Sequence, residues 1–132
     1  MAPAAADTIL KHFREWNRGP ADYDKIITGD LGSIGKRALL DLLKERGYDI
    51  SDRHLDCGML IYEDEEQDTH AGGSGCGCCA VTLASYIIGK LSEKTWQRIL
   101  FLPTGALLSK TSFNEGSSIP AICHGLVLEA AD

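Results

Sequence analysis

The sequence lacks the basic clusters that proteins use to bind nucleic-acid backbones. Its 132 residues include 13 Lys and Arg against 19 Asp and Glu, a formal net charge of -6. No dense run of basic residues stands out against this acidic balance, so broad binding to a phosphate backbone, which requires counterion displacement, is not expected. The composition therefore predicts no nucleic-acid partner, while 44% hydrophobic residues are typical of an ordinary globular domain.

A long apolar run is also missing. Met1 to Asp7 shows no basic region followed by an apolar stretch, so no secretory signal peptide is expected. The longest uncharged stretch runs from His70 to Gly89, but its first half is rich in Gly and Cys, which make a poor membrane-spanning helix. We interpret this stretch as a loop followed by a buried helix.

The cysteines do not form a disulfide framework, because their number is odd and two of them are adjacent. Reduced thiols are therefore expected at Cys57, Cys76, Cys78, Cys79 and Cys123. The closely spaced Cys76, Cys78 and Cys79 are not expected to form a structural zinc site. No thiol stands out as an activated nucleophile. The sequence predicts no metal and no cofactor.

Apolar periodicity predicts helices at 4–16, 33–46 and 80–91, and short apolar runs predict strands at 25–28, 98–102 and 121–129. Gly47 is placed to cap the second helix. Residues 49–56 are polar and expected on the surface, residues 59–62 form a short strand or an irregular segment, and His124 is expected to be a buried histidine of the last strand. The third helix, apolar on nearly every side, is expected to be buried on most sides.

This order of elements predicts an α/β domain with a mixed central sheet, helices packed on it and an antiparallel last pair of strands. A sheet of three strands is narrow, so apolar surface should remain exposed unless something covers it. We expect the cover to come from a partner domain or a second copy.

The densest candidate site is the glycine-rich segment that precedes the third helix. Gly72, Gly73, Ser74 and Gly75 could bring backbone N–H groups close to an anion at the helix start, or could simply be small residues where a helix enters a packed core. His70, at the mouth of this loop, could be a general base, a ligand or a structural histidine. Asp30 follows the first strand and could cap the next helix or point into the crevice at the end of the sheet.

Several long segments together resemble the stage V sporulation protein AD family: Met1 to Ala5, Thr28 to Gly32, Cys57 to Tyr62, Gln67 to Cys78 and Pro103 to Ser109. The resemblance covers nearly the whole chain. It implies a thiolase-like fold of two α/β halves, with residues 1–132 in the C-terminal half and the N-terminal half absent.

The resemblance also implies a function. Members are expected to be non-catalytic sporulation proteins that bind dipicolinic acid and assist its uptake into the developing spore together with other stage V sporulation membrane proteins. The expected location is cytoplasmic, peripheral to the spore inner membrane. The expected partners are dipicolinic acid, with or without calcium, and either the N-terminal half or further copies in a homo-oligomer. The glycine segment could form one face of the ligand slot, with Lys36, Arg37 or calcium beside Asp30 compensating the charge of the dianion.

True thiolases use four catalytic groups, and the resemblance implies that this chain has a match for one of them. Their first-half Cys lies outside this chain, their Asn position falls on Gly29 and their second Cys falls on Ser117, so His70 alone matches a catalytic residue. The expected ligand-binding residues are Asp30, His70, Gly72, Gly73, Ser74, Gly75 and Ser117. Two alternatives stay open: an active thiolase- or 3-oxoacyl synthase-type acyltransferase with His70 as base and Cys57 or Cys76 recruited, and a purely structural protein.

Overall fold

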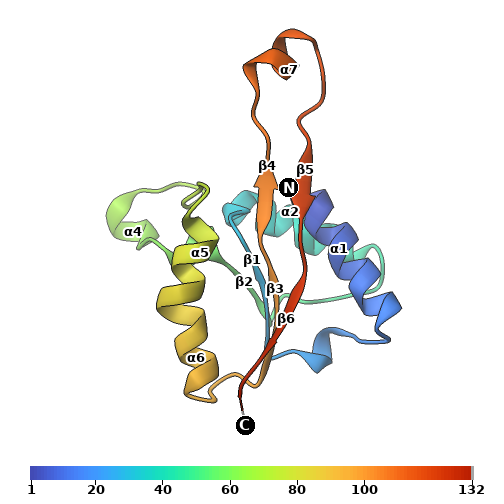
Figure 1. Cartoon of the computed structure of the whole chain (residues 1–132), viewed down its shortest axis with the longest axis vertical. Helices are drawn as coiled ribbons and strands as arrows, with labels where there is room; N and C mark the ends of the chain where they lie inside the picture. The colour runs from blue at the N-terminus through green and yellow to red at the C-terminus, as the bar shows by residue number, and fades with distance from the viewer. Residues whose placement is uncertain (132) are drawn as a thin grey trace.

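The computed structural model of the chain describes residues 1–131, which form a four-stranded sheet with helices on both faces and a projecting hairpin (Figure 1). The strands are β1 (Lys25–Thr28), β2 (His54–Asp56), β3 (Arg98–Leu102) and β6 (Leu126–Glu129), in the order β2-β1-β3-β6. The first three are mutually parallel, and β6 is antiparallel to β3. The predicted α/β architecture, its mixed sheet and its antiparallel last pair are therefore confirmed.

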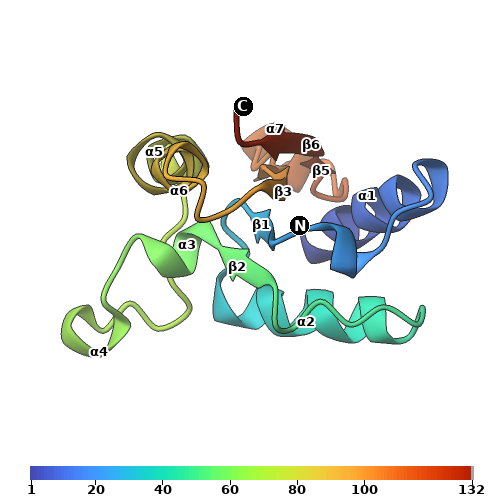
Figure 2. The ribbon, with the colours of Figure 1, turned by 90° about the horizontal axis from the view of Figure 1, so that it is seen from below.

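Two layers of helices enclose the sheet (Figure 2). One face carries α1 (Ala2–Glu15) and α2 (Gly32–Lys44), and the other carries α3 (Cys57–Leu60), α5 (Cys78–Thr82), the π-helical segment η2 (Leu83–Ile87) and α6 (Ile88–Ser92). Successive strand residues point to opposite faces. Ile26 accordingly joins the core under α1 and α2, and Ile27 joins the core under α5 to α6.

Three predicted segments differ from the structure. Residues 54–56 are not polar surface but strand β2, with His54 and Asp56 buried. Residues 57–60 form helix α3. The sequence could not predict this helix, because an apolar run of four residues does not distinguish helix from strand. The predicted strand 121–129 is two strands, β5 (Ala121–Cys123) and β6, separated at His124, which is exposed rather than buried.

The helix predicted at 80–91 is confirmed as the continuous run α5, η2 and α6, but not its burial. Thr82, Ile87 and Leu91 face the sheet and are buried, whereas Val81 and Ile88 are about half exposed. Its apolar outer face therefore has no cover within residues 1–131. Gly47, at φ 85°, ends α2 as predicted, and Tyr48 N–H donates to the Leu43 carbonyl at 3.0 Å.

The projecting hairpin consists of β4 (Thr104–Ala106), α7 (Lys110–Asn114) and β5, and it extends beyond the end of the sheet (Figure 1). Its tip exposes Leu107, Leu108 and Phe113 around an open apolar groove of about 350 Å³. The remaining short elements are η1 (Pro20–Asp22) and α4 (Asp64–Gln67). None of the helices within residues 1–131 combines the length and apolarity required to cross a bilayer.

A buried polar chain joins β1 to β2. The Thr28 hydroxyl donates to Asp56 at 2.6 Å, so its oxygen accepts from His54 Nε2 at 3.0 Å. This assignment leaves His54 Nδ1 as the unprotonated ring nitrogen, and no group of the described residues bonds to it. Protonation would place an N–H there without an acceptor. Burial, with a contribution from Lys36, lowers the pKa of His54 from 6.5 to about 4.

Acid should therefore destabilise the fold through His54. The unfolded state binds a proton below pH 6.5 and the folded state only near pH 4, so this contribution is complete above 6.5 and is lost as the pH falls between those values. At about 1.4 kcal/mol per pKa unit, the loss is about 3 kcal/mol. Urea unfolding across this range should show a shallower pH dependence for His54→Gln than for the wild type. Parallel curves would contradict the assignment.

Candidate functional site

The carboxylate of Asp56 organises the end of the sheet where β1 and β2 finish. It is buried and accepts three hydrogen bonds: from the Thr28 hydroxyl and from the backbone N–H groups of Leu31 and Gly32, at 2.6 to 2.9 Å. Two of these donors open helix α2. The sequence did not predict a role for Asp56. It offered Asp30 as a possible cap of this helix, but the carboxylate that caps α2 is that of Asp56.

Asp30 instead joins three chain segments at the carboxyl ends of β1 and β3. Its carboxylate accepts from the Ser74 hydroxyl at 2.7 Å, the Gly75 N–H at 3.3 Å and the Thr104 hydroxyl at 3.0 Å. Its own N–H donates to the oxygen of Thr104 at 3.1 Å. The structure thus brings three predicted site residues, Asp30, Ser74 and Gly75, into direct contact. Thr104 is a fourth member that no sequence pattern marked.

The first half of the glycine-rich segment is fixed by packing. Gly73 N–H donates to the Gly58 carbonyl at 2.7 Å, and a Cβ on Gly73 would lie 2.4 Å from the Tyr62 ring. The cavity beside Gly72 measures about 40 Å³, enough for about one water molecule. Gly72 and Gly73 therefore serve the close approach of the loop to α3, and the room beside them is too small for an aromatic dicarboxylate.

The second half of the segment is open. Ser74, Gly75 and Gly77 are exposed, and a Cβ on either glycine would meet no atom within 4 Å. This turn leads directly into α5, whose first residues follow Gly77. Helix starts carry backbone N–H groups and a partial positive charge. The turn from Ser74 to Gly77 is thus the part of the segment that a ligand could reach, beside the carboxylate of Asp30.

The other two predicted residues lie elsewhere. The side chain of His70 is 85% exposed, with its ring Nδ1 3.6 Å from Asp68. Ser117 is exposed on the projecting hairpin and lines the groove near Phe113 rather than the glycine segment. Within the described part of the chain, no three His, Cys, Asp or Glu side chains converge closely enough to hold a metal ion.

Comparison with known proteins identifies the family. The family described as Stage V sporulation protein AD (SpoVAD) matches residues 1–129. The chain belongs to the stage V sporulation protein AD family. It is 50% identical over 131 residues to Stage V sporulation protein AD of Bacillus subtilis (strain 168). That alignment covers 99% of this chain and 38% of the relative, so the chain spans well under half of the relative's length.

Three of the five thiols are poorly suited to nucleophilic catalysis. Burial raises the pKa of Cys57 to about 12 and that of Cys123 to about 11, and it also raises the pKa of Cys78. The thiolate is the nucleophilic form of cysteine. Near neutral pH these three side chains are therefore protonated thiols inside the two cores, where they pack as small apolar groups.

Substitution of Asp56 should destabilise the folded chain. Asp56→Asn would turn an N–H₂ group toward backbone and hydroxyl donors, leaving at least one buried donor unpaired, at a cost of about 1–3 kcal/mol. Urea unfolding measures this loss. Asp52→Asn, in the exposed part of the same segment, is the matched control and should leave stability nearly unchanged. Equal stability of the two variants would refute the role given to Asp56.

Alkylation should separate the cysteines by exposure. Brief iodoacetamide treatment of the folded chain near neutral pH, followed by peptide mass spectrometry, should label Cys76, which is exposed, and spare Cys57 and Cys123. All five should react after unfolding in urea, which serves as the control. Rapid native labelling of Cys57 would show that its thiol is accessible and ionised, contrary to its environment.

Proposed function

We propose that this chain is the C-terminal half of a two-part, thiolase-like sporulation protein that binds dipicolinic acid without transforming it and assists its uptake into the developing spore. Membership of the family supports the sporulation role. The observation that carries the ligand-binding part is the open turn from Ser74 to Gly77. It lies where β1 and β3 end, the position at which α/β sheets usually bind ligands, and it leads into the start of a helix.

The environment of the candidate residues favours binding over catalysis. Acyl transfer needs a thiolate and a base held against the substrate. Cys57 is buried with a raised pKa, and His70 is at the surface beside Asp68. No contact of the described residues pairs His70 with a thiol. The acyltransferase alternative therefore has no geometric support of its own, whereas a binding turn needs only accessible N–H groups.

The charge of the ligand sets a further requirement. Dipicolinate is a dianion, and the carboxylate of Asp30 lies beside the turn. Lys36, on α2, already donates to the His54 carbonyl at 3.4 Å. We propose that calcium, chelated by the ring nitrogen and carboxylates of the ligand, offsets this repulsion. Binding should then be stronger with calcium than without it.

The second half of the proposed protein would cover the outer face of α5 to α6. This face exposes Val81, Tyr86 and Ile88, and it borders an open groove of about 240 Å³ shared with Leu60 and Ile61. Exposed apolar patches of this kind mark interaction sites. The N-terminal half would supply the other wall of the ligand slot. We propose further that the assembled protein is peripheral to the spore inner membrane and works with other stage V sporulation membrane proteins.

Calorimetric titration of dipicolinate, with and without calcium, tests the ligand. Gly77→Val should fill the open turn, where an added Cβ meets no atom within 4 Å, and weaken binding by about tenfold or more, about 1.4 kcal/mol. Gly89→Val is the matched control, since a Cβ there also meets no atom within 4 Å but lies at the far end of the helix. Full-length Bacillus subtilis protein should bind more tightly than the chain. Absence of heat from both proteins, or equal affinity of the two glycine variants, would rule out this site.

A further inference from the structure

The outer edge of β6 carries unpaired backbone groups. Among residues 1–131, no strand pairs with the side of β6 that faces away from β3. Two bonds of the β3–β6 register fix which residues face which side: Ala130 N–H donates to the Gln97 carbonyl at 2.9 Å, and His124 N–H donates to the Pro103 carbonyl at 3.2 Å. Antiparallel bonds recur at every second residue. Leu126 and Leu128 therefore bond toward β3.

The residues between them, Gly125, Val127 and Glu129, direct their N–H and C=O groups outward. No hydrogen bond from the described residues reaches these groups. The same three residues line an open groove of about 440 Å³ whose other wall is formed by His12, Trp16 and Arg18, at and just beyond the end of α1. The free edge is thus one side of an open groove.

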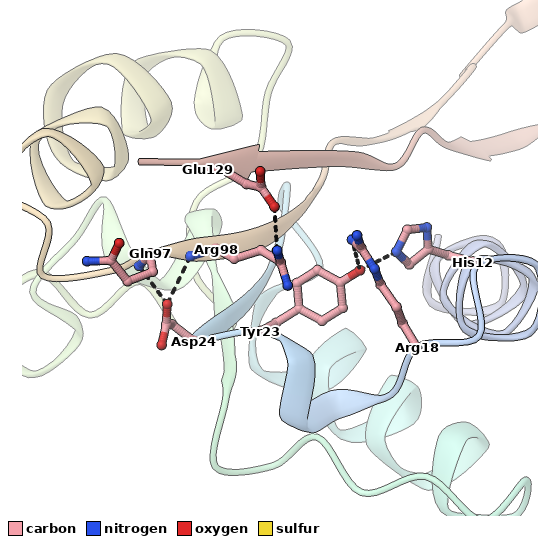
Figure 3. Close-up of polar contacts among 7 residues, drawn as sticks. All are labelled: His12, Arg18, Tyr23, Asp24, Gln97, Arg98 and Glu129. Carbon is pink, nitrogen blue, oxygen red and sulfur yellow. Dashed lines mark hydrogen bonds and ion pairs between the residues drawn. The ribbon is translucent and has the colours of Figure 1, made fainter. Parts of the chain in front are cut away.

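Polar contacts hold the walls of this groove in place (Figure 3). Arg98 bonds to Glu129 across the two strands at 2.5 Å, which neutralises that carboxylate. Arg18 donates to the Tyr23 hydroxyl at 3.2 Å, and His12 shares a short hydrogen bond with the same hydroxyl. Trp16 remains 66% exposed above the groove. Hydrogen bonds and an ion pair thus hold His12, Arg18 and Glu129, while Trp16 is a large uncovered aromatic side chain.

The two edges of the sheet differ in how they are protected. At the β2 edge, the carbonyl of His54 accepts from Lys36, so a lysine covers an outward backbone group. The sequence of β6, Leu126 to Glu129, contains neither lysine nor proline, the residues that commonly block edge pairing. Leu126 is also nearly half exposed on the opposite face. The β6 edge thus has the features of a pairing surface.

We propose that β6 of a second copy of this chain pairs with this edge, antiparallel and with two-fold symmetry about Val127. In this register Val127 pairs with the partner's Val127, and Gly125 pairs with the partner's Glu129. All outward groups of both strands are then bonded, because residues 125, 127 and 129 face outward in each copy. The two sheets become one continuous eight-stranded sheet.

The same register accounts for the exposed apolar side chains along the edge. Leu126 falls beside the partner's Leu128 on one face, where both are apolar. On the other face, two copies of Trp16 would approach the seam from the two α1 helices. Within the chain, a Cβ on Gly125 would lie 3.1 Å from the Thr8 methyl, so this glycine serves the packing of β6 beside α1. The pairing is therefore self-complementary, and a foreign strand is not needed to satisfy the edge.

Sedimentation and hydrogen exchange of the 132-residue chain test this pairing. With rising concentration, sedimentation equilibrium should show a monomer–dimer transition. In parallel, the amides of Val127 and Glu129 should become slow to exchange, whereas those of Leu126 and Leu128 should be slow at every concentration because they bond to β3. A chain that stays monomeric, or a dimer that leaves the Val127 and Glu129 amides fast, would overturn the proposal. This exchange readout needs no substitution, so it does not depend on a variant folding.

A pair of variants locates the interface. Val127→Pro removes one outward N–H while sparing the bonds to β3, and should abolish the dimer with the circular dichroism of the fold retained. Leu108→Ser, on the exposed hairpin, is the control and should leave the dimer intact. Loss of the dimer in Leu108→Ser but not in Val127→Pro would assign association to the hairpin and refute the β6 pairing. A monomeric chain that captures an unrelated extended peptide at β6 would equally refute a second copy as occupant.

Discussion

The carboxylate of Asp56 is the interaction on which the arrangement of the candidate site depends. It gathers the Thr28 hydroxyl and the first N–H groups of α2 around one buried charge. This bonding fixes the turn after β1, including Gly32 at φ 66°. A Cβ on Gly32 would lie 2.3 Å from the Ala71 carbonyl, which accepts from Ser33 N–H at 2.7 Å. The position of the glycine-rich segment therefore depends on the start of α2, which Asp56 fixes.

Two helices begin at this end of the sheet, and they are used differently. The start of α2 is already occupied by the protein's own groups, the Asp56 carboxylate and the Ala71 carbonyl. An external anion would have to displace a buried, charge-assisted set of bonds there. The start of α5 follows an exposed glycine turn that is held from one side by Asp30. Of these two helix starts, that of α5 is therefore the one left accessible from outside.

Periodicity predicted the elements whose residues repeat over several turns or alternate across both cores, which is why α1, α2, β1 and β3 were found. It could not identify Asp56, since a carboxylate in the polar run from Asp49 has the sequence signature of an exposed residue. Its role comes from donors on β1 and α2, distant in sequence. The apolar run of 121–129 likewise gave no sign that the strand is interrupted at His124, where the chain leaves the hairpin and joins the main sheet.

In the candidate site, too, some residues could be predicted from the sequence and others only from contacts between distant segments. The glycine segment and Asp30 were predicted together because both flank element ends that meet at one edge of an α/β sheet. Ser117 was assigned by alignment to a distant enzyme family, and its position on the projecting hairpin follows instead from the excursion between β4 and β5. Thr104 was missed because a threonine after a strand carries no chemical signal until Asp30 lies 3.0 Å away.

The two uncovered surfaces of the chain call for different kinds of partner. The outer face of α5 to α6 presents apolar side chains while its backbone is satisfied within the helix, so a packed apolar surface would cover it. The β6 edge presents backbone donors and acceptors, which only another extended strand can satisfy in full. In Figure 2 the α5 to α6 layer covers one face of the sheet, whereas β6 is an edge strand. The two surfaces are therefore distinct, and their chemistry calls for a packed apolar surface at one and an extended strand at the other.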